Sequence, residues 1–476
     1  RDLVRSRGLG DVYKRQVYWG MRFGALLATA DSPARTKATL SGLRLVRNLY
    51  RAKPQTAPRS FTWLYASGVL GPLGCGLDLT AKRCLADILN GRGSLFIAGL
   101  FFCYGGLWFM PKRSGSYSVP FSFELLSFGE AVGLAADTGR ISGDAGPLLE
   151  TVVDMLDELG RPDEYFDCIQ VAGTNGKTST TRFSAAILRG EGLKTALYTS
   201  PQLVRYPERM EVDGRVVSDE AFARGVSTAV EAGRRVNARR VAAGERAYTI
   251  TPFDLLTAAA LVVFAEARVD VAVLEVGMGG RWDATSATDP VAVAITGIGL
   301  DHTRILGDTL EAIAGEKAAV IKPGRLVVLG EGTHESSVQR VMDARCRVCG
   351  IVPLVVNHAT TKVPEHVGDT VEFSCTTPRA IYTSSMVKPA YQPQNAACAI
   401  MLCEGYLGRE LDHDKLDASL MGCPTPGRFD VLGTDPLKLI DACHNPQSCE
   451  IFVSALDEID PVSYTHLRAH ETVLDL

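Results

Sequence analysis

The stretch from Tyr165 to Arg189 reads YFDCIQVAGTNGKTSTTRFSAAILR. It begins with a short apolar run, turns at the glycine-rich residues 173–176, and continues after Thr178 with apolar residues at helical spacing. A strand that passes through a glycine turn into a helix is the unit of a sheet covered by helices on both faces. This stretch therefore predicts an α/β fold.

The turn itself, Gly173-Thr174-Asn175-Gly176-Lys177-Thr178, predicts a phosphate-binding loop. Glycines let backbone N–H groups curve around phosphate oxygens, and the start of the next helix carries partial positive charge. The Lys177 ammonium can reach terminal phosphates, and the Thr178 hydroxyl suits Mg²⁺. The full Walker spacing would place glycine at position 171, where this chain has valine. An incidental lysine in a glycine turn is the alternative, but the flanking strand and helix favour nucleotide binding.

Outward from this loop, apolar runs alternate with helical patterns. The runs are continuous rather than alternating, which is typical of parallel strands buried on both faces, and lie at residues 194–199, 269–276, 291–298 and 325–329. Helical spacing covers 252–267 and 308–321, and we expect Asp308 to cap the second helix, with Glu311 three residues on. The sequence thus predicts a phosphate-loop ATPase domain with a mostly parallel, doubly wound sheet.

Polar residues follow three of these strands. Ser200, Glu275 and the pair Asp301-His302 each come after an apolar run, and ligands of α/β sheets gather beyond the carboxyl ends of the strands. Hard oxygens with one imidazole can hold one or two Mg²⁺ ions that bridge ATP phosphates. Lys317, in the helix at 308–321, reads from the residues alone as a solvated lysine paired with Glu316.

Charge divides the chain unevenly. The 476 residues hold 50 Lys+Arg and 54 Asp+Glu, a net charge of −4, which argues against a dedicated nucleic-acid binder. Residues 1–120, however, hold 18 Lys+Arg and only five acidic residues. Because the opening and closing stretches resemble translated sequencing adapters, we interpret 1–120 as a non-native extension and 462–476 as an adapter-derived tail.

Two alternatives for residues 1–120 stay open. Ser94–Met110 is uncharged for 17 residues, which is borderline for a membrane-spanning helix, so a membrane or targeting segment is one of them. A genuine soluble extension is the other. We favour the artefact and expect no membrane partner.

The 12 cysteines show no disulfide framework, which favours a reducing cytoplasm. The single CxxC pair, Cys346 and Cys349, has no second pair at zinc-finger spacing. We therefore expect surface or half-buried thiols there rather than a metal site.

At this point six stretches resemble the folylpolyglutamate synthase and dihydrofolate synthase family of the Mur ligase superfamily. They are VAGTNGKTST (171–180), LYTSPQLVRYPERMEVDGRVVSDE (197–220), VLEVGMGGRWDAT (273–285), IGLDHTRILGDTLEAIAGEKAAVIKPG (298–324), GRFDVL (427–432) and DACHNP (441–446). The resemblance implies an ATP-dependent amide ligase. ATP would phosphorylate a carboxylate of dihydropteroate or a reduced folate, and the amine of L-glutamate would attack the acyl phosphate, releasing phosphate.

The resemblance also implies roles for individual residues. Residues Thr174 to Lys177 would cradle the ATP phosphates, and Lys317 matches a lysine that is carbamylated in the family. The remaining matches are the metal group Thr178, Ser200, Glu275, His302 and Lys317, the nucleotide contacts Gly173, Asn395, Arg428 and Asp441, the pterin-facing positions Phe253, Asp283 and Ala284, and the catalytic group Lys177, His302, Lys317, Arg428 and His444.

Some positions depart from the family pattern. Gln202 and Tyr391 stand where the family usually has histidine, Pro207 replaces an asparagine, and Thr178 replaces a glycine. These departures weaken any statement about substrate range.

The resemblance also gives domain limits, with a central ATP-binding domain at 121–423 and the start of a Rossmann-like ligase domain at 424–461. Since only about 17 plausible residues follow His444, we expect that second domain to be truncated and the chain to be poorly active. We also expect a monomer. A Mur-type ligase of peptidoglycan precursors and a nucleotide-binding fragment without ligase activity remain the alternatives.

Overall fold

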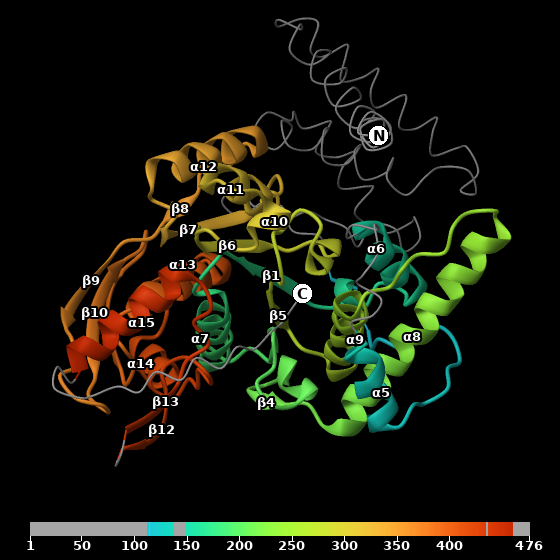
Figure 1. Cartoon of the computed structure of the whole chain (residues 1–476), viewed down its shortest axis with the longest axis horizontal. Coiled ribbons are helices and arrows are strands. Elements are labelled where there is room, and N and C mark those ends of the chain that lie inside the picture. Colours follow the sequence, from blue (N-terminus) through green and yellow to red (C-terminus); the bar gives the residue numbers. More distant parts are fainter. Residues whose placement is uncertain (1–111, 114, 138–147, 435–436, 460–476) are drawn as a thin grey trace, which may run out of the picture. The chain divides into compact units, whose positions relative to one another are not determined.

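The computed structural model describes residues 112–113, 115–137, 148–434 and 437–459 (Figure 1). The apolar run Ser94–Met110 and the tail at 462–476 lie outside these residues, so their interpretation is not tested. Within the described part of the chain, none of the helices combines the length and apolar character needed to cross a bilayer.

The described residues are organised around one eight-stranded sheet with the strand order β4-β3-β2-β5-β1-β6-β7-β8. Its strands are β1 (Asp167–Ala172), β2 (Thr195–Tyr198), β3 (Met210–Val212), β4 (Arg215–Val216), β5 (Val271–Glu275), β6 (Ala292–Gly297), β7 (Leu326–Gly332) and β8 (Leu354–Val355). All neighbours from β2 to β8 pair in parallel, and only β3 and β4 at one edge are antiparallel. The predicted mostly parallel sheet is confirmed.

Helices cover both faces of this sheet, as the doubly wound prediction requires. The described α-helices are α5 (Phe128–Ala135), α6 (Leu149–Glu158), α7 (Lys177–Gly190), α8 (Asp219–Ala242), α9 (Pro252–Ala267), α10 (Thr303–Leu306), α11 (Leu310–Ala318), α12 (Ser336–Cys349), α13 (Gln392–Leu407), α14 (His413–Met421) and α15 (Pro446–Ile459). Three short 3₁₀ helices complete the set, η2 (Pro162–Glu164), η3 (Tyr206–Arg209) and η4 (Ala284–Ala287). Figure 1 shows α7 and α13 on one side of β1 and β5, with α8 and α9 on the other.

Alternation along the central strand explains this arrangement. Ile169 and Val171 of β1 belong to the buried cluster that α7, α13 and α14 share, whereas Cys168 belongs to the cluster formed with α5, α6, α8 and α9. A third cluster joins the sheet to α11 and α12. Successive strand residues point to opposite faces, so a continuous apolar run feeds both layers.

The helix predicted at 308–321 begins and ends differently. Its α-helical part is α11, and its cap is Thr309, whose side chain accepts from the backbone N–H of Ala312. The predicted cap at Asp308 is therefore wrong by one residue. By contrast, α9 matches the predicted 252–267, since Thr251 and Asp254 form a capping box and Pro252 occupies the first turn.

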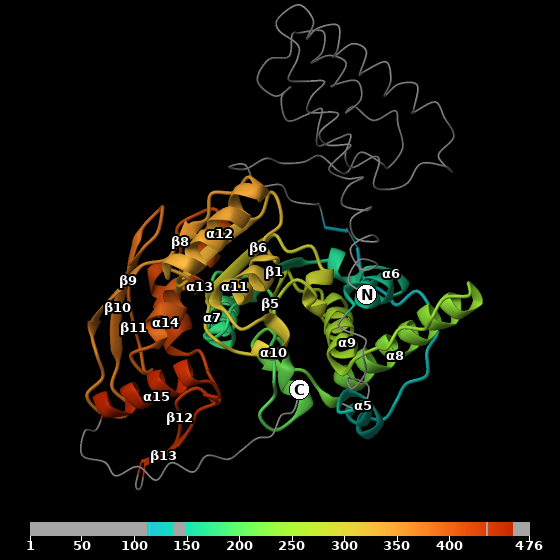
Figure 2. The same cartoon turned by 45° about the horizontal axis from the view of Figure 1, so that its top comes forward.

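Two antiparallel sheets lie outside the predicted pattern. Strands β9 (His358–Lys362), β10 (Val371–Thr376) and β11 (Ile381–Met386) form one of them, which packs against α13 and α14 (Figure 2). Strands β12 (Asp430–Thr434) and β13 (Leu437–Ile440) form the other, ahead of α15. This short antiparallel pair lies where we expected the opening of a Rossmann-like domain, whose parallel pairing it does not display.

Part of the segment that we assigned to a non-native extension packs on the domain. The Tyr117 side chain is buried, and its hydroxyl donates to the carbonyl of Leu159 at 2.8 Å. The Lys112 ammonium lies 3.1 Å from the Asp167 carboxylate at the start of β1. The described residues before 121 therefore belong with the fold.

The CxxC pair is more deeply placed than we expected. Cys346 and Cys349 lie on α12, and both are buried in the cluster between this helix and the sheet. Burial raises the pKa of the Cys346 thiol to about 11. The expectation of surface or half-buried thiols is wrong, because both face the sheet.

Candidate active site

The predicted phosphate loop leaves the carboxyl end of β1, the strand flanked by β5 and β6. At two positions of this loop there is no room for any side chain, so glycine is required. A Cβ on Gly173 would lie 2.0 Å from the Thr296 hydroxyl oxygen, and one on Gly176 would lie 2.2 Å from the side-chain oxygen of Asn395. Both also have positive φ angles, which favour glycine. The loop is therefore pressed against β6 and α13, with its backbone N–H groups at the start of α7.

Side chains of the loop are anchored within it. The Thr174 hydroxyl donates to the carbonyl of Gly299 at 3.1 Å and accepts from its N–H at 2.9 Å. The Lys177 ammonium donates to the Thr174 carbonyl at 3.0 Å. Burial lowers the pKa of Lys177, and the carboxylates of Glu275 and Asp301 oppose that effect. A half-buried cation held at the loop can meet the negative charge of a phosphate.

Glu275, Thr178 and Ser200 come together, as the predicted metal group requires. The Glu275 carboxylate is buried at the end of β5, accepts from the Thr178 hydroxyl at 2.8 Å, and accepts from the Ser200 N–H at 3.2 Å. Burial raises its pKa, and Lys177 opposes that rise most strongly. A carboxylate beside a hydroxyl at a phosphate loop fits Mg²⁺, which is usually held by few protein ligands together with phosphate oxygens.

His302, the remaining residue of the predicted metal group apart from Lys317, lies beside Asp301. It lies in the loop after β6, at positive φ, and its N–H donates to the carboxylate of the neighbouring Asp301 at 2.8 Å. Burial lowers its pKa, and the ammonium groups of Lys177 and Lys317 act in the same direction. Among the described residues, no three His, Cys, Asp or Glu side chains gather as a metal-binding cluster. A metal here would therefore depend on hydroxyl, carboxylate and phosphate oxygens.

Lys317 contradicts the interpretation drawn from the residues alone. Its side chain is 3% exposed, and its ammonium donates to the Gly173 carbonyl at 2.7 Å. Glu316 instead accepts from Arg281 at 2.9 Å. Burial, reinforced by Lys177, lowers the pKa of Lys317 to about 7. A large share of this lysine is therefore a neutral amine near neutral pH, the form that can react with CO₂.

The segment after residue 424 reaches the loop through several side chains. The Arg428 guanidinium lies 3.4 Å from the Thr178 hydroxyl oxygen. The His444 ring lies 3.4 Å from the Asp301 carboxylate, which raises its pKa. Asp441, by contrast, accepts from the N–H groups of Phe429 and Cys443 in its own segment and from the hydroxyl of Tyr391 at the start of α13. Arg428 and His444 thus face the predicted site, whereas Asp441 shapes the segment.

Two residues that sequence reasoning missed complete this contact. Asn445 and Asn175 exchange side-chain hydrogen bonds at 3.0 and 3.3 Å, and Asn175 also donates to Gln447 at 2.9 Å. Asn445 further donates to Asp301 at 3.2 Å. Asn445 lies in the quoted DACHNP run and Gln447 directly after it. Their partner Asn175 is 270 and 272 residues away, and no local pattern indicates such a pair.

The positions assigned to the pterin differ in character. The Phe253 ring lies against Gly277, where a Cβ would be 2.6 Å from it, and neighbours the Tyr198 ring. The Asp283 carboxylate is buried and accepts from Met278 N–H and from both the N–H and the hydroxyl of Thr285. Ala284 is buried. The Asp283 carboxylate therefore fixes the conformation of the loop after β5. The Phe253 ring packs against the same loop at Gly277.

Asn395, assigned to the adenine, lies at the start of α13. Its side-chain N–H donates to the Gln392 side chain at 3.0 Å, and its side-chain oxygen is the atom that excludes a side chain at Gly176. It thus contacts the loop at Gly176.

Comparisons with known proteins agree with this geometry. Residues 171–402 match the Mur ligase middle domain. The chain is 38% identical to a probable bifunctional folylpolyglutamate synthase/dihydropteroate synthase of Haloferax volcanii over 70% of this chain and 39% of that protein. It is 31% identical to the dihydrofolate synthase/folylpolyglutamate synthase of Bacillus subtilis, over 66% of this chain and 72% of that protein.

A solved structure is similar over most of the described residues. The folylpolyglutamate synthase of Mycobacterium tuberculosis, complexed with ADP and AMPPCP, superposes with a TM-score of 0.62 and 30% identity over 68% of this chain and 74% of that one. The chain spans about two fifths of the length of the haloarchaeal relative and almost three quarters of the Bacillus one. By these matches, the chain belongs to the folylpolyglutamate synthase and dihydrofolate synthase family of the Mur ligases.

Proposed function

We propose that this chain is an ATP-dependent ligase that joins L-glutamate to a carboxylate of dihydropteroate or a reduced folate. The observation that carries the proposal is the convergence of Lys177, Thr178 and Glu275 with Lys317 at one phosphate loop. Family membership supplies the substrate class. A Mur-type ligase would use the same loop, so the carboxylate substrate is what the test must identify.

The described residues suit phosphoryl transfer to a carboxylate. The Lys177 ammonium lies at the Thr174 carbonyl and the Arg428 guanidinium beside the Thr178 hydroxyl, so two cations at the loop would stabilise charge on the transferring phosphoryl group. Mg²⁺, when bound, would neutralise phosphate charge, with Thr178, Ser200 and Glu275 as its holders and His302 with Lys317 beside a second position. The acyl phosphate formed on the substrate would then lose phosphate as the glutamate amine attacks.

Lys317 supports a more specific part of this proposal. Its buried, largely neutral amine is 2.7 Å from the Gly173 carbonyl, at the side of the loop where Asp301 and His302 lie. Addition of CO₂ to the neutral amine forms an N–C bond and releases one proton, leaving an anionic carbamate. That change would convert an amine that cannot hold a metal while it is protonated into an anionic oxygen ligand beside the loop.

The proposal also covers domain limits, oligomeric state and location. We include a central domain at 121–423, although Tyr117 shows that packing begins earlier, and a second domain beginning near 424. We include a monomer and a cytoplasmic location; the nine described free cysteines agree with a reducing compartment.

The test is incorporation of labelled glutamate by the full chain with Mg-ATP, using 7,8-dihydropteroate and tetrahydrofolate in separate reactions. We expect product from at least one pterin, and loss of that product in Lys177→Ala but not in the exposed control Lys415→Ala. Nucleotide binding is measured in parallel with a fluorescent ATP analogue. Glutamate transfer to a muropeptide but to neither pterin, or intact nucleotide binding without any transfer, would contradict the proposal.

A further inference from the structure

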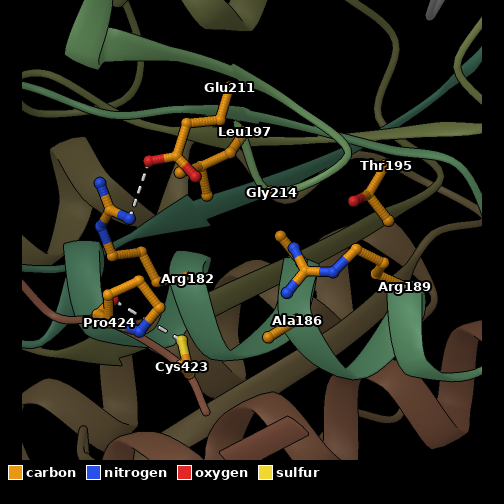
Figure 3. A pocket seen from close by; sticks show the side chains of 10 residues that line it. Arg182, Ala186, Arg189, Thr195, Leu197, Glu211, Gly214, Cys423 and Pro424 are labelled. Carbon is orange, nitrogen blue, oxygen red and sulfur yellow. Dashed lines mark hydrogen bonds and ion pairs between the residues drawn. The ribbon is translucent and has the colours of Figure 1, made fainter. Parts of the chain in front are cut away.

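A hollow lined by two arginines lies along α7, away from the phosphate loop. Arg182 and Arg189 stand seven residues apart on this helix, roughly 10 Å along its axis, and therefore lie on nearly the same side. The hollow is a shallow one, with about 350 Å³ of empty space when the open solvent at its mouth is included. Figure 3 shows both side chains rising from α7 toward β2 and the β3–β4 turn, with Ala186 between them.

The charge in this hollow is only partly balanced. Arg182 is 8% exposed and pairs with the Glu211 carboxylate at 2.9 Å, but its buried Nε–H has no hydrogen-bond partner among the described residues. Buried guanidinium groups are ordinarily fully hydrogen-bonded. The second cation, Arg189, lies against the backbone at Gly214, where a Cβ would be 2.1 Å from it, and the part of the chain that the structure describes offers it no ion-pair partner.

Other groups around the hollow add to the positive balance. The Lys388 ammonium donates to the Thr425 hydroxyl at 2.9 Å, and it acts electrostatically on Arg182. The Thr195 side chain lies on the wall beside Arg189 (Figure 3). Glu211 is the acidic side chain of the lining, and it is already paired. Within the lining, Arg182 and Arg189 face this one carboxylate, whereas Lys388 lies outside the lining and has Asp430 nearby. The surplus of one positive charge leaves the hollow suited to an anion.

We infer that this hollow binds a small oxyanion of the phosphate class. A guanidinium group presents a planar fork of N–H donors that matches two oxygens of a phosphate. Arg182 and Arg189 enter the hollow from positions two turns apart on α7, and the donors not already paired are the Arg182 Nε–H and the guanidinium of Arg189. A tetrahedral anion would present oxygens in several directions to such separated donors, whereas a planar carboxylate has only two oxygens in one plane.

The position of the hollow connects this site with the segment that follows. Cys423 and Pro424 line it, and four residues later Arg428 reaches Thr178 of the phosphate loop. A bound phosphate would join α7 to the start of that segment. The inference does not depend on the proposed ligase activity, because it concerns a different face of α7.

The experiment is a titration of the full chain with inorganic phosphate by calorimetry, at constant ionic strength set with chloride. Three proteins are compared: the unaltered chain, Arg189→Gln, and the control Arg347→Gln, which removes the same charge from an exposed position on α12. We expect Arg189→Gln to lose at least tenfold in affinity at one phosphate site, with Arg347→Gln unchanged. Phosphate binding at the phosphate loop would be common to all three and would cancel in the comparison.

A second measurement locates the ion. Phosphate should slow the modification of Arg189 by phenylglyoxal, followed by mass spectrometry of peptides, and should leave Arg347 unaffected. Identical isotherms for the two variants, or no protection of Arg189, would overturn the inference. Equal protection by L-glutamate at the same concentration would overturn the phosphate class in favour of a carboxylate. An unchanged melting temperature of Arg189→Gln without phosphate shows that the variant is folded.

Discussion

Replacement of Lys317 by methionine tests the electrostatic description of the site without any ligand. In the fold the pKa of Lys317 is about 7, against 10.5 for the exposed side chain. Between these values the unfolded chain binds more protons than the folded one. Stability therefore rises with pH across that window, because the free energy of unfolding follows the difference in bound protons.

The size of the effect follows from the same two values. At pH 7 about half of the folded molecules carry a charged Lys317, and at pH 9 almost none do. Linkage between pKa values of 7 and 10.5 gives a rise in the unfolding free energy of about 2 kcal/mol from pH 7 to pH 9. Lys317→Met should lack this rise. The lost hydrogen bond to the Gly173 carbonyl would cost about 1 kcal/mol at every pH and would leave the slope unaffected.

The assay is urea unfolding of both proteins at pH 7, 8 and 9 in buffers freed of CO₂, with the exposed Lys415→Met as control. The difference between the unaltered chain and Lys317→Met should change by about 2 kcal/mol over this range, and Lys415→Met should follow the unaltered chain. Parallel pH profiles for all three proteins would refute the placement of a titrating lysine beside the loop. Added bicarbonate at pH 8 should then change the free energy of unfolding only of the proteins that retain Lys317.

Three further predictions concern the loop and its contacts. Gly176→Ala places a Cβ 2.2 Å from the Asn395 side chain at a φ of +83°, so we expect it to bind a fluorescent ATP analogue at least tenfold more weakly. The control Gly192→Ala, at a φ of +96° with no atom within 4 Å, should bind the analogue normally. Equal affinities of the two variants would contradict the steric argument. Glu275→Gln removes the charge that faces Thr178 and Ser200, so the affinity for Mn²⁺ in the presence of nucleotide should fall about tenfold, as measured by electron paramagnetic resonance. Glu316→Gln is the control. An unchanged Mn²⁺ affinity of Glu275→Gln would exclude Glu275 as a metal ligand. Asn445→Ala breaks the reciprocal hydrogen bonds with Asn175 and should speed amide hydrogen exchange in α15 by about tenfold, in line with roughly 1–2 kcal/mol of lost hydrogen bonding. The control is Asn357→Ala, in an exposed loop. Equal exchange rates of α15 in the two variants would show that the contact is weak.

The sequence predicted the parts of the fold that local patterns determine. The strand, loop and helix at 165–189 appear as β1, the glycine loop and α7, and α9 agrees with its predicted limits because a capping box and a proline mark its start. Strands β9, β10 and β11 escaped prediction, since β9 has no buried residue and the alternation of burial in β10 and β11 extends over only six positions. The cap at Asp308 failed because Asp308 and Thr309 are both good caps, and tertiary packing selected the second.

The site was predictable where a motif carries its own geometry. Lys177 and Thr178 follow from the loop, and Glu275 from its place at the end of a strand. Burial of Lys317 could not be read from its helix, because the Gly173 carbonyl that it meets is 144 residues away. The resemblance to a family named that lysine, but the cause of its lowered pKa became visible only in three dimensions. The contact of Asn445 with Asn175 has the same origin.

The helix that starts at the phosphate loop has a consequence for motion. Residues 179–188 of α7 are buried without interruption, between the sheet on one side and α13 with α14 on the other. A helix enclosed in this way cannot slide or rotate unless its neighbours also move. Any displacement of the residues from 428 onward must then be absorbed between Cys423 and Arg428. Within that short stretch Pro424 and Pro426 have fixed φ angles, and Thr425 is buried with its hydroxyl bonded to Lys388, so the connection is stiff. A nucleotide at this loop would lie between a tightly packed helix and a segment joined to it through this stiff stretch.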